Sequence, residues 1–199
     1  MSLRTPAVFV DRDGTVIREV GYLARLDQIE LLPQVPEAIR LLQSHGLKVV
    51  MVTNQSAVAR RIISEQQLHQ IHREIEKELD QSGANLDGLY YCPHHPTEGT
   101  YPYRVSCRCR KPQPGLVERA CLDLGLDPHI SYVIGDQMSD MELAARSGAR
   151  GILIESQTSG VIGDGPSGPR EGPLFVPVPD FWTATQWIVQ HLSGKGTLQ

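Results

Sequence analysis

Short runs of apolar, largely β-branched residues alternate along this chain with segments of helical periodicity, and this alternation constrains the fold most. The apolar runs predict strands at residues 7–10, 47–52, 86–92, 130–135 and 151–154. Helices are predicted between and after them, at 35–45 with Gly46 past the end, from 64 onward, and at 115–124, 138–147 and 180–192. Because strands that alternate with helices are joined by right-handed crossovers, we predict an α/β fold with a mainly parallel sheet flanked by helices.

Capping signals support the predicted helices. Ser64 and Gln67 have the spacing of a capping box, and the apolar face that follows (Leu68, Ile71, Ile75, Leu79) is expected to be core. Pro36 falls in the first turn of its helix, where a missing N–H is tolerated. The run 174–178 is predicted to add an edge strand, because its proline favours an edge.

Length and composition indicate one soluble domain. The chain has 199 residues, 40% hydrophobic and 21% charged, so we expect a single domain over residues 1–199. The Gly-, Pro- and Ser-rich stretch 156–172 is predicted to be a flexible loop. No apolar run reaches the ~20 residues of a membrane span, which favours a cytoplasmic protein. The formal net charge of −4 argues against nucleic-acid binding. Nothing in the sequence requires an oligomer, so we expect a monomer.

Polar side chains follow three of the predicted strands. Asp11 comes after the first strand, Thr53-Asn54-Gln55 after the second and Asp136 after the fourth. Ligands of such sheets bind beyond the carboxyl ends of the strands, so these groups are expected to share one pocket. In an extended chain, Asp11 and Asp13 would also face one spot. That stretch alone is equally compatible with a turn whose Asp caps a helix.

Those carboxylates predict a magnesium site and a phosphoryl-transfer centre. Asp11, Asp13 and Asp136 suit a hard divalent cation, Mg²⁺, which would cancel their repulsion of a phosphate. Asp11 is then the candidate nucleophile and Asp13 the candidate general acid. Thr53 and Lys111 would hold the phosphoryl oxygens. Asp140, in the first turn of the next helix, would cap that helix or orient the lysine.

The loop at residues 92–109 carries a second candidate metal site. Two ligands one residue apart, a loop, and two more one residue apart can close a tetrahedral zinc site without an open position. Such a structural zinc would pin the loop that delivers Arg110 and Lys111 to the pocket. The ligands are Cys92, His94 or His95, Cys107 and Cys109.

The motifs together resemble those of the haloacid dehalogenase (HAD) superfamily of aspartate-nucleophile phosphohydrolases. "DRDGT", Thr53, Lys111 and "GDQMSD" look like its four motifs, in the right order and at the right strand ends. The resemblance implies a Rossmann-like HAD fold and an aspartyl-phosphate intermediate, and the second Asp of the first motif, Asp13, implies a phosphatase. The interval between the first two motifs leaves no room for a large cap domain, so loops are expected to close the site.

With its zinc loop, the chain resembles a subfamily of heptose bisphosphate 7-phosphatases and histidinol-phosphatases. "DRDGTVIREVGYL", "VTNQSAVAR" and "YYCPHHP" look closest to the heptose enzymes of lipopolysaccharide biosynthesis, and the resemblance favours His94 over His95 as the zinc ligand. It also implies contacts with a sugar bisphosphate from Glu19, Val20, Gly21, Tyr22, Thr53, Asn54, Gln55, Ser56, Arg110 and Lys111.

One departure from the family and several alternatives stay open. Gln137 stands where a lysine is expected, which is harmless if that position offers Mg²⁺ only a backbone carbonyl. The anomer preferred at the sugar C1 is undetermined. Histidinol phosphate and the 3′-phosphate of a nucleic-acid end are alternative substrates. A zinc-stabilised binding module with a dead site is a further alternative, against which the presence of Asp11 and Asp13 counts.

Overall fold

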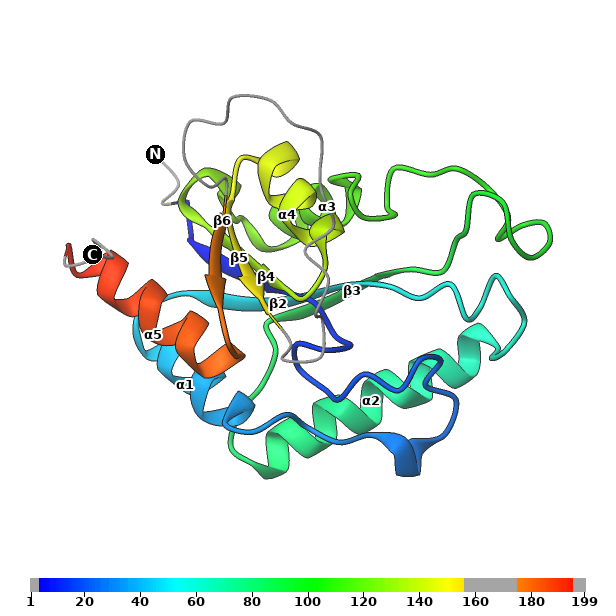
Figure 1. The fold of residues 1–199 in the computed structure, drawn as a ribbon, viewed down its shortest axis with the longest axis horizontal. Coiled ribbons are helices and arrows are strands. Elements are labelled where there is room, and N and C mark those ends of the chain that lie inside the picture. The colour runs from blue at the N-terminus through cyan, green and yellow to red at the C-terminus, as the bar shows by residue number, and fades with distance from the viewer. Residues whose placement is uncertain (1–3, 156–174, 195–199) are drawn as a thin grey trace.

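The computed structural model describes residues 4–155 and 175–194, and the loop predicted at 156–172 lies outside these residues. One parallel sheet has the strand order β3-β2-β1-β4-β5-β6 (Figure 1). Its strands are β1 (Ala7–Val10), β2 (Lys48–Asn54), β3 (Gly88–Cys92), β4 (Tyr132–Gly135), β5 (Arg150–Ile154) and β6 (Phe175–Val178). Every neighbouring pair is parallel, which confirms the predicted α/β class and the edge position of β6.

Helices cover both faces of the sheet (Figure 1). They are α1 (Val35–Ser44), α2 (Glu65–Gln81), α3 (Gly115–Leu124), α4 (Met138–Ser147) and α5 (Phe181–Leu192), with 3₁₀ turns η1 (Leu26–Gln28) and η2 (Pro128–Ile130). The two core clusters follow the alternation of β1: Val8 and Val10 pack with α1, α2 and α5, whereas Ala7 and Phe9 pack with α3 and α4.

The predicted caps are present, with two shifts in boundaries. Ser64 Oγ accepts from the N–H of Gln67, and Gln67 Oε1 accepts from the N–H of Ser64, closing the capping box of α2. α1 ends at Ser44 rather than at residue 45, and Gly46 lies past its end as predicted. β2 runs to Asn54, two residues beyond the prediction, so Thr53 stands within the strand and not after it.

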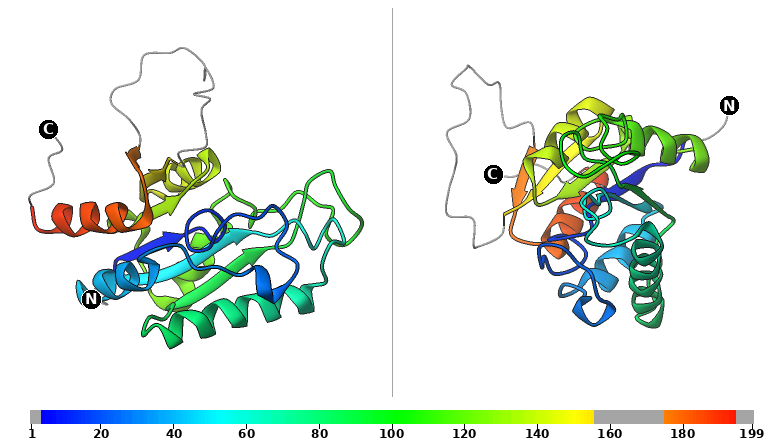
Figure 2. Two further views of the ribbon diagram at one scale, coloured as in Figure 1. Left: turned by 60° about the horizontal axis from the view of Figure 1, so that its bottom comes forward. Right: turned by 90° about the vertical axis from the view of Figure 1, so that its right-hand side faces the viewer.

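Residues 11–34, between β1 and α1, form a small irregular segment that leaves the sheet, and we call this segment the excursion. An isolated antiparallel bridge between Ile17 and Leu31 closes its base, and the N–H of Arg18 donates to the carbonyl of Glu30. Its only helical turn, η1, lies beside α2 (Figure 2). The described part of the chain therefore contains no cap domain inserted here. No helix in it has the length and apolar character that crossing a membrane requires.

Candidate active site

Three carboxylates meet at the carboxyl edge of the sheet. Asp11 follows β1, Asp136 follows β4, and Asp140 lies in the first turn of α4. One oxygen from each lies within 4.8 Å of the other two. The topology therefore gathers negative charge from two adjacent strands and a helix start at one point, as the rule for parallel sheets predicts.

A buried lysine neutralises part of this charge. Lys111 is 4% exposed, and its Nζ lies 2.8 Å from Asp11 Oδ1 and 2.7 Å from Asp140 Oδ1. It also donates to the carbonyl of Val52, at 3.1 Å. Burial alone would lower the pKa of Lys111, but the carboxylates of Asp11 and Asp140 outweigh it and raise that pKa. The lysine is thus a fixed positive charge within the site.

The backbone of Lys111 is fastened to the end of β2. Asn54 Nδ2 donates to the carbonyl of Lys111 at 3.1 Å, and Asn54 Oδ1 accepts from the N–H of Lys111 at 2.9 Å. Both halves of the Asn54 amide are therefore used to place the lysine. Asn54 was predicted to contact substrate, and its position favours a positioning role instead.

The environment of Asp136 fits a divalent cation. Its Oδ1 is buried and has no hydrogen-bond partner among residues 4–155 and 175–194. Burial first, and then the charges of Asp11 and Asp140, raise the pKa of Asp136 to about 7. An unpartnered carboxylate oxygen beside two further carboxylates is a donor set that Mg²⁺ prefers.

Gly14 allows the first motif to pass close to that carboxylate. Its φ is +73°, and a Cβ built there would lie 2.1 Å from Asp136 Oδ2. Only glycine combines this left-handed conformation with so close an approach. The Gly of "DRDGT" is thus explained by the position of a residue from a different strand.

The carboxylate of Asp13 does not join the cluster, which corrects the expectation that Asp11 and Asp13 face one spot. The chain leaves β1 at Val10 and turns, with the N–H of Val16 donating to the carbonyl of Arg12, so the alternation of an extended strand no longer applies. Asp13 instead accepts from Arg12, at 2.9–3.1 Å, and from Gln55 Nε2, at 2.8 Å. Asp140 completes the carboxylate cluster in its place.

Gln55 connects Asp13 with Thr53. Its Nε2 lies 2.9 Å from Thr53 Oγ1 as well as 2.8 Å from Asp13 Oδ2. Both Gln55 and Thr53 are buried. The candidate acid and the candidate phosphoryl contact therefore lie on the same side of the site, joined through one amide.

The other predicted contact residues lie at the rim. Ser56 is half-buried, whereas the side chains of residues 19–22 are exposed. Partial burial, and then the charge of the Asp13 carboxylate, raise the pKa of Glu19, so Glu19 lies near enough to Asp13 for the two carboxylates to interact. Arg110 is half-buried and donates to the carbonyl of His94 at 3.0 Å. Gln137 is exposed at the start of α4, and its N–H donates to Asp140 Oδ2.

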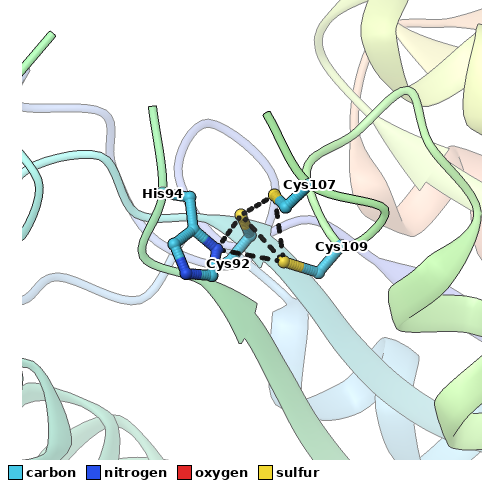
Figure 3. Close-up of side chains that lie close together, drawn as sticks. All are labelled: Cys92, His94, Cys107 and Cys109. Atoms are coloured by element: carbon cyan, nitrogen blue, oxygen red, sulfur yellow. Dashed lines mark hydrogen bonds between the residues drawn. The ribbon is translucent and has the colours of Figure 1, made fainter. Parts of the chain in front are cut away.

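The four predicted zinc ligands converge (Figure 3). Cys109 Sγ lies 3.3 Å from Cys92 Sγ, 3.2 Å from Cys107 Sγ and 3.3 Å from His94 Nδ1. His95 points elsewhere, since its Nδ1 accepts from the backbone N–H of residues 97 and 98. Three sulfurs and one imidazole nitrogen, all within 4.8 Å of one another, are the donor set of a closed zinc site, and the geometry selects His94.

This cluster adjoins the catalytic groups. Cys92 ends β3, and its carbonyl accepts from the N–H of Gln55 at 2.7 Å. On the other side, Cys109 precedes Arg110 and Lys111 directly. A metal at this cluster would therefore fix both Gln55 and the lysine.

Sequence reasoning missed the buried partners of Asp13. Arg12 is 2% exposed, and its Nη1 lies 3.4 Å from Nε2 of His72 on α2. Burial and the charge of Arg12 lower the pKa of His72 to about 3, so this histidine is neutral. The position of Arg12 between Asp11 and Asp13 could have indicated that its guanidinium pairs with a carboxylate. No sequence pattern could have indicated its contact with His72, which lies 60 residues further along the chain.

Comparison with known proteins agrees with this site. A family model described as haloacid dehalogenase-like hydrolase matches residues 8–83, and one described as HAD-hydrolase-like matches residues 108–165. These matches, together with the parallel sheet and the aspartate cluster at its carboxyl edge, define the class of protein. The protein is a HAD-like hydrolase.

Two curated relatives are more specific. The D-glycero-β-D-manno-heptose-1,7-bisphosphate 7-phosphatase of Haemophilus ducreyi is 39% identical over 160 residues, 80% of this chain and 87% of that protein. The enzyme of the same name from Photorhabdus laumondii is 43% identical over 144 residues, 72% of this chain and 77% of that protein. The chain therefore belongs to the heptose-1,7-bisphosphate 7-phosphatase family.

A solved structure supports the same placement. The crystal structure of D,D-heptose 1,7-bisphosphate phosphatase from B. bronchiseptica, complexed with magnesium and phosphate, matches with a TM-score of 0.78. It is 28% identical and covers 94% of this chain and 99% of that one. The similarity thus extends over nearly the whole fold.

Proposed function

We propose that this protein removes the 7-phosphate of D-glycero-β-D-manno-heptose 1,7-bisphosphate in the synthesis of lipopolysaccharide heptose precursors. The similarity to enzymes of that name over most of their length supports the substrate. The observation that carries the reaction class is the Asp11–Lys111–Asp140 arrangement beside Asp136. It offers a carboxylate nucleophile whose charge is partly balanced before the substrate arrives.

Asp11 is the proposed nucleophile. Its Oδ1 accepts from the N–H of Arg12 at 2.7 Å and lies 2.8 Å from Lys111 Nζ, so we assign the attack on phosphorus to Oδ2. The bond between phosphorus and the 7-oxygen breaks as the Asp11 oxygen–phosphorus bond forms. Water then attacks the aspartyl-phosphate, releasing inorganic phosphate and restoring the carboxylate.

Asp13 is the proposed general acid and base. It protonates the leaving 7-oxygen and later takes a proton from the attacking water. Thr53 and Lys111 contact the phosphoryl oxygens, and the Gln55 amide keeps Asp13 beside Thr53. Residues 19–22, Ser56 and Arg110 are proposed to contact the sugar bisphosphate.

Two metals are part of the proposal. Mg²⁺ would be held by Asp11, Asp136 and backbone or carboxylate oxygens of the first and last motifs, with Asp13 and Gln137 as candidates. When bound, it supplies the positive charge that lets two anions approach each other. Zn²⁺ would be held by Cys92, His94, Cys107 and Cys109 and would act structurally.

A substrate panel with released phosphate as the readout tests the proposal. The panel contains both anomers of heptose 1,7-bisphosphate, histidinol phosphate and a generic sugar monophosphate, each assayed with Mg²⁺. We expect the highest kcat/KM for the β-anomer. A higher value for histidinol phosphate would refute the substrate assignment.

The nucleophile is tested by Asp11→Asn, which is nearly isosteric. We expect loss of turnover with an unchanged circular dichroism spectrum. Substantial residual turnover would refute the aspartyl-phosphate step. We further propose that the enzyme works as a monomer in the cytoplasm.

A further inference from the structure

Three separate segments meet at Arg60, in the turn after β2. Its guanidinium carbon lies 5.7 Å from the centroid of the Tyr22 ring, in the excursion between β1 and α1. Its Nη1 lies 3.6 Å from Glu98 Oε2, and its Nη2 lies 3.4 Å from His95 Nε2, both in the zinc loop. One planar group therefore touches the excursion and the zinc loop at the same time.

The zinc loop is held against this turn by its backbone as well. Gly99 has a φ of +83°, and a Cβ there would lie 1.8 Å from the carbonyl oxygen of Ala59. The tip of the loop thus packs directly on the residue before Arg60. This close approach keeps Glu98 within reach of the guanidinium.

The charges and exposures suit a weak, reversible connection. The Arg60 and Glu98 side chains are 31% and 53% exposed, so their ion pair is screened by solvent. Tyr22 is 46% exposed, so its cation–π contact is likewise modest. Such contacts bias the position of a segment without locking it. That behaviour suits a site that must admit a sugar bisphosphate and over which the described residues place no cap domain.

We propose that Arg60 is a positioning residue for substrate recognition, holding Tyr22 and the zinc loop together so that residues 19–22 lie over the sugar. The inference rests on the proposed function, which assigns residues 19–22 to the sugar bisphosphate. Arg60 makes no contact with Asp11, Asp136 or Lys111 that would involve it in phosphoryl transfer. Its loss is therefore expected to weaken recognition of the sugar and to spare the chemistry.

The test compares Arg60→Gln with Arg61→Gln. Both changes remove one positive charge from adjacent positions, but Arg61 is exposed and forms no ion pair with any residue the structure describes. With heptose 1,7-bisphosphate, Arg60→Gln is expected to raise KM about three- to tenfold with kcat nearly unchanged, whereas Arg61→Gln is neutral. With p-nitrophenyl phosphate, which reaches only the phosphoryl site, kcat/KM is expected to stay at the wild-type value for both.

A second readout does not depend on the substrate. Hydrogen exchange of the free protein is expected to be faster at amides 19–24 and 97–99 in Arg60→Gln, and unchanged in Arg61→Gln. Equal exchange in the two variants, or an equal loss on both substrates, would overturn the positioning role. If wild-type protein fails to hydrolyse heptose bisphosphate, the proposed function fails. The exchange comparison, and KM for the best substrate of the panel, still decide the role of Arg60.

Discussion

The ammonium group of Lys111 explains how three carboxylates share one corner of the molecule. It lies 2.8 Å from Asp11 and 2.7 Å from Asp140. The side-chain amide of Asn54 holds the backbone N–H and carbonyl of Lys111 through two hydrogen bonds. Asp136 receives no such contact and keeps a raised pKa. At the scale of single residues, Lys111 thus balances the charges of Asp11 and Asp140 and leaves Asp136 without a cationic partner of its own among the described residues. Mg²⁺ is proposed to bind beside Asp136.

This imbalance predicts a pH-dependent effect of magnesium on stability. The pKa of Asp136 is raised from 3.8 to about 7, so between these values the metal-free folded state binds more protons than the unfolded state. The contribution of protonated Asp136 to the free energy of unfolding is therefore complete below pH 3.8 and is lost as the pH rises from there to about 7. Bound Mg²⁺ would compensate the ionised carboxylate. We expect the Mg²⁺-induced rise in Tm to be larger at about pH 8 than at about pH 5.

Differential scanning fluorimetry at the two pH values provides the measurement, with Asp136→Asn as the control. The amide does not ionise, so the variant should lose both the difference between pH values and most of the response to Mg²⁺. An equal rise in Tm at both pH values for wild-type protein would contradict the prediction.

Gly14 offers a second test at the residue scale. Gly14→Ala places a methyl group 2.1 Å from Asp136 Oδ2, whereas Gly46→Ala, at a φ of +80°, meets nothing within 4 Å. Both variants should lose stability, by about 1–2 kcal/mol from the left-handed backbone. Only Gly14→Ala should also displace the carboxylate and lower kcat/KM, by about 100-fold. Phosphate-release kinetics beside thermal unfolding separate the two effects, and a fully active Gly14→Ala would contradict the crowding argument.

Among the elements, the zinc loop links metal binding to catalysis. Its first ligand ends β3 and bonds to Gln55 through its backbone carbonyl, and its last ligand precedes Arg110 and Lys111. A second tie is independent of metal: Tyr103 and Tyr91 both donate to the carboxylate of Glu65, at the start of α2. The loop therefore has a metal-dependent anchor beside the site, and the Tyr103 hydrogen bond joins the Arg60 contacts as ties that need no metal.

Removing the metal-dependent anchor should impair catalysis before it unfolds the domain. We expect Cys107→Ser to lower kcat/KM by at least about tenfold, with zinc content reduced and the far-UV spectrum retained. Cys121→Ser is the matched control, since Cys121 lies in α3 outside the cluster. Zinc is measured with a colorimetric chelator. Full activity in a zinc-free Cys107→Ser protein would show that the loop holds its geometry without metal.

At the scale of the whole molecule, one sheet connects all parts of the described structure. β1 lies at its centre, and the two core clusters extend from it to the helices on either face. Such continuity favours one cooperative unit over the described residues, and the single domain expected for residues 1–199 stays a prediction. α5 is the last helix along the described part of the chain, and its Phe181 and Trp187 side chains are buried in the core.

This arrangement predicts a single unfolding transition. The two tryptophans, Trp182 and Trp187, both lie in α5, so their fluorescence reports that edge of the molecule, whereas far-UV circular dichroism reports all elements. In urea, we expect the two signals to change together with one midpoint. An earlier fluorescence transition would mean that α5 and its edge of the sheet unfold separately.

The sequence by itself determined the α/β class, the parallel sheet, the helix caps and the cluster of three cysteines and a histidine, with His94 favoured through the family resemblance. These features depend on periodicity and short spacings, which the chain carries locally. The strand-end rule brought together Asp11, Thr53 and Asp136, because parallel strands bring their carboxyl ends to one edge. The resemblance of the motifs to the HAD superfamily added Lys111.

Only the tertiary structure decided how those side chains are oriented. The turn after β1 directs Asp13 to Arg12 and Gln55, the amide of Asn54 is used by Lys111, and Asp140 joins the carboxylate cluster. It also brought Arg60 to Tyr22 and confirmed His94, which the resemblance had favoured over His95. These outcomes depend on contacts between segments far apart in the chain, and local spacing carries no information about where a turning backbone points a side chain.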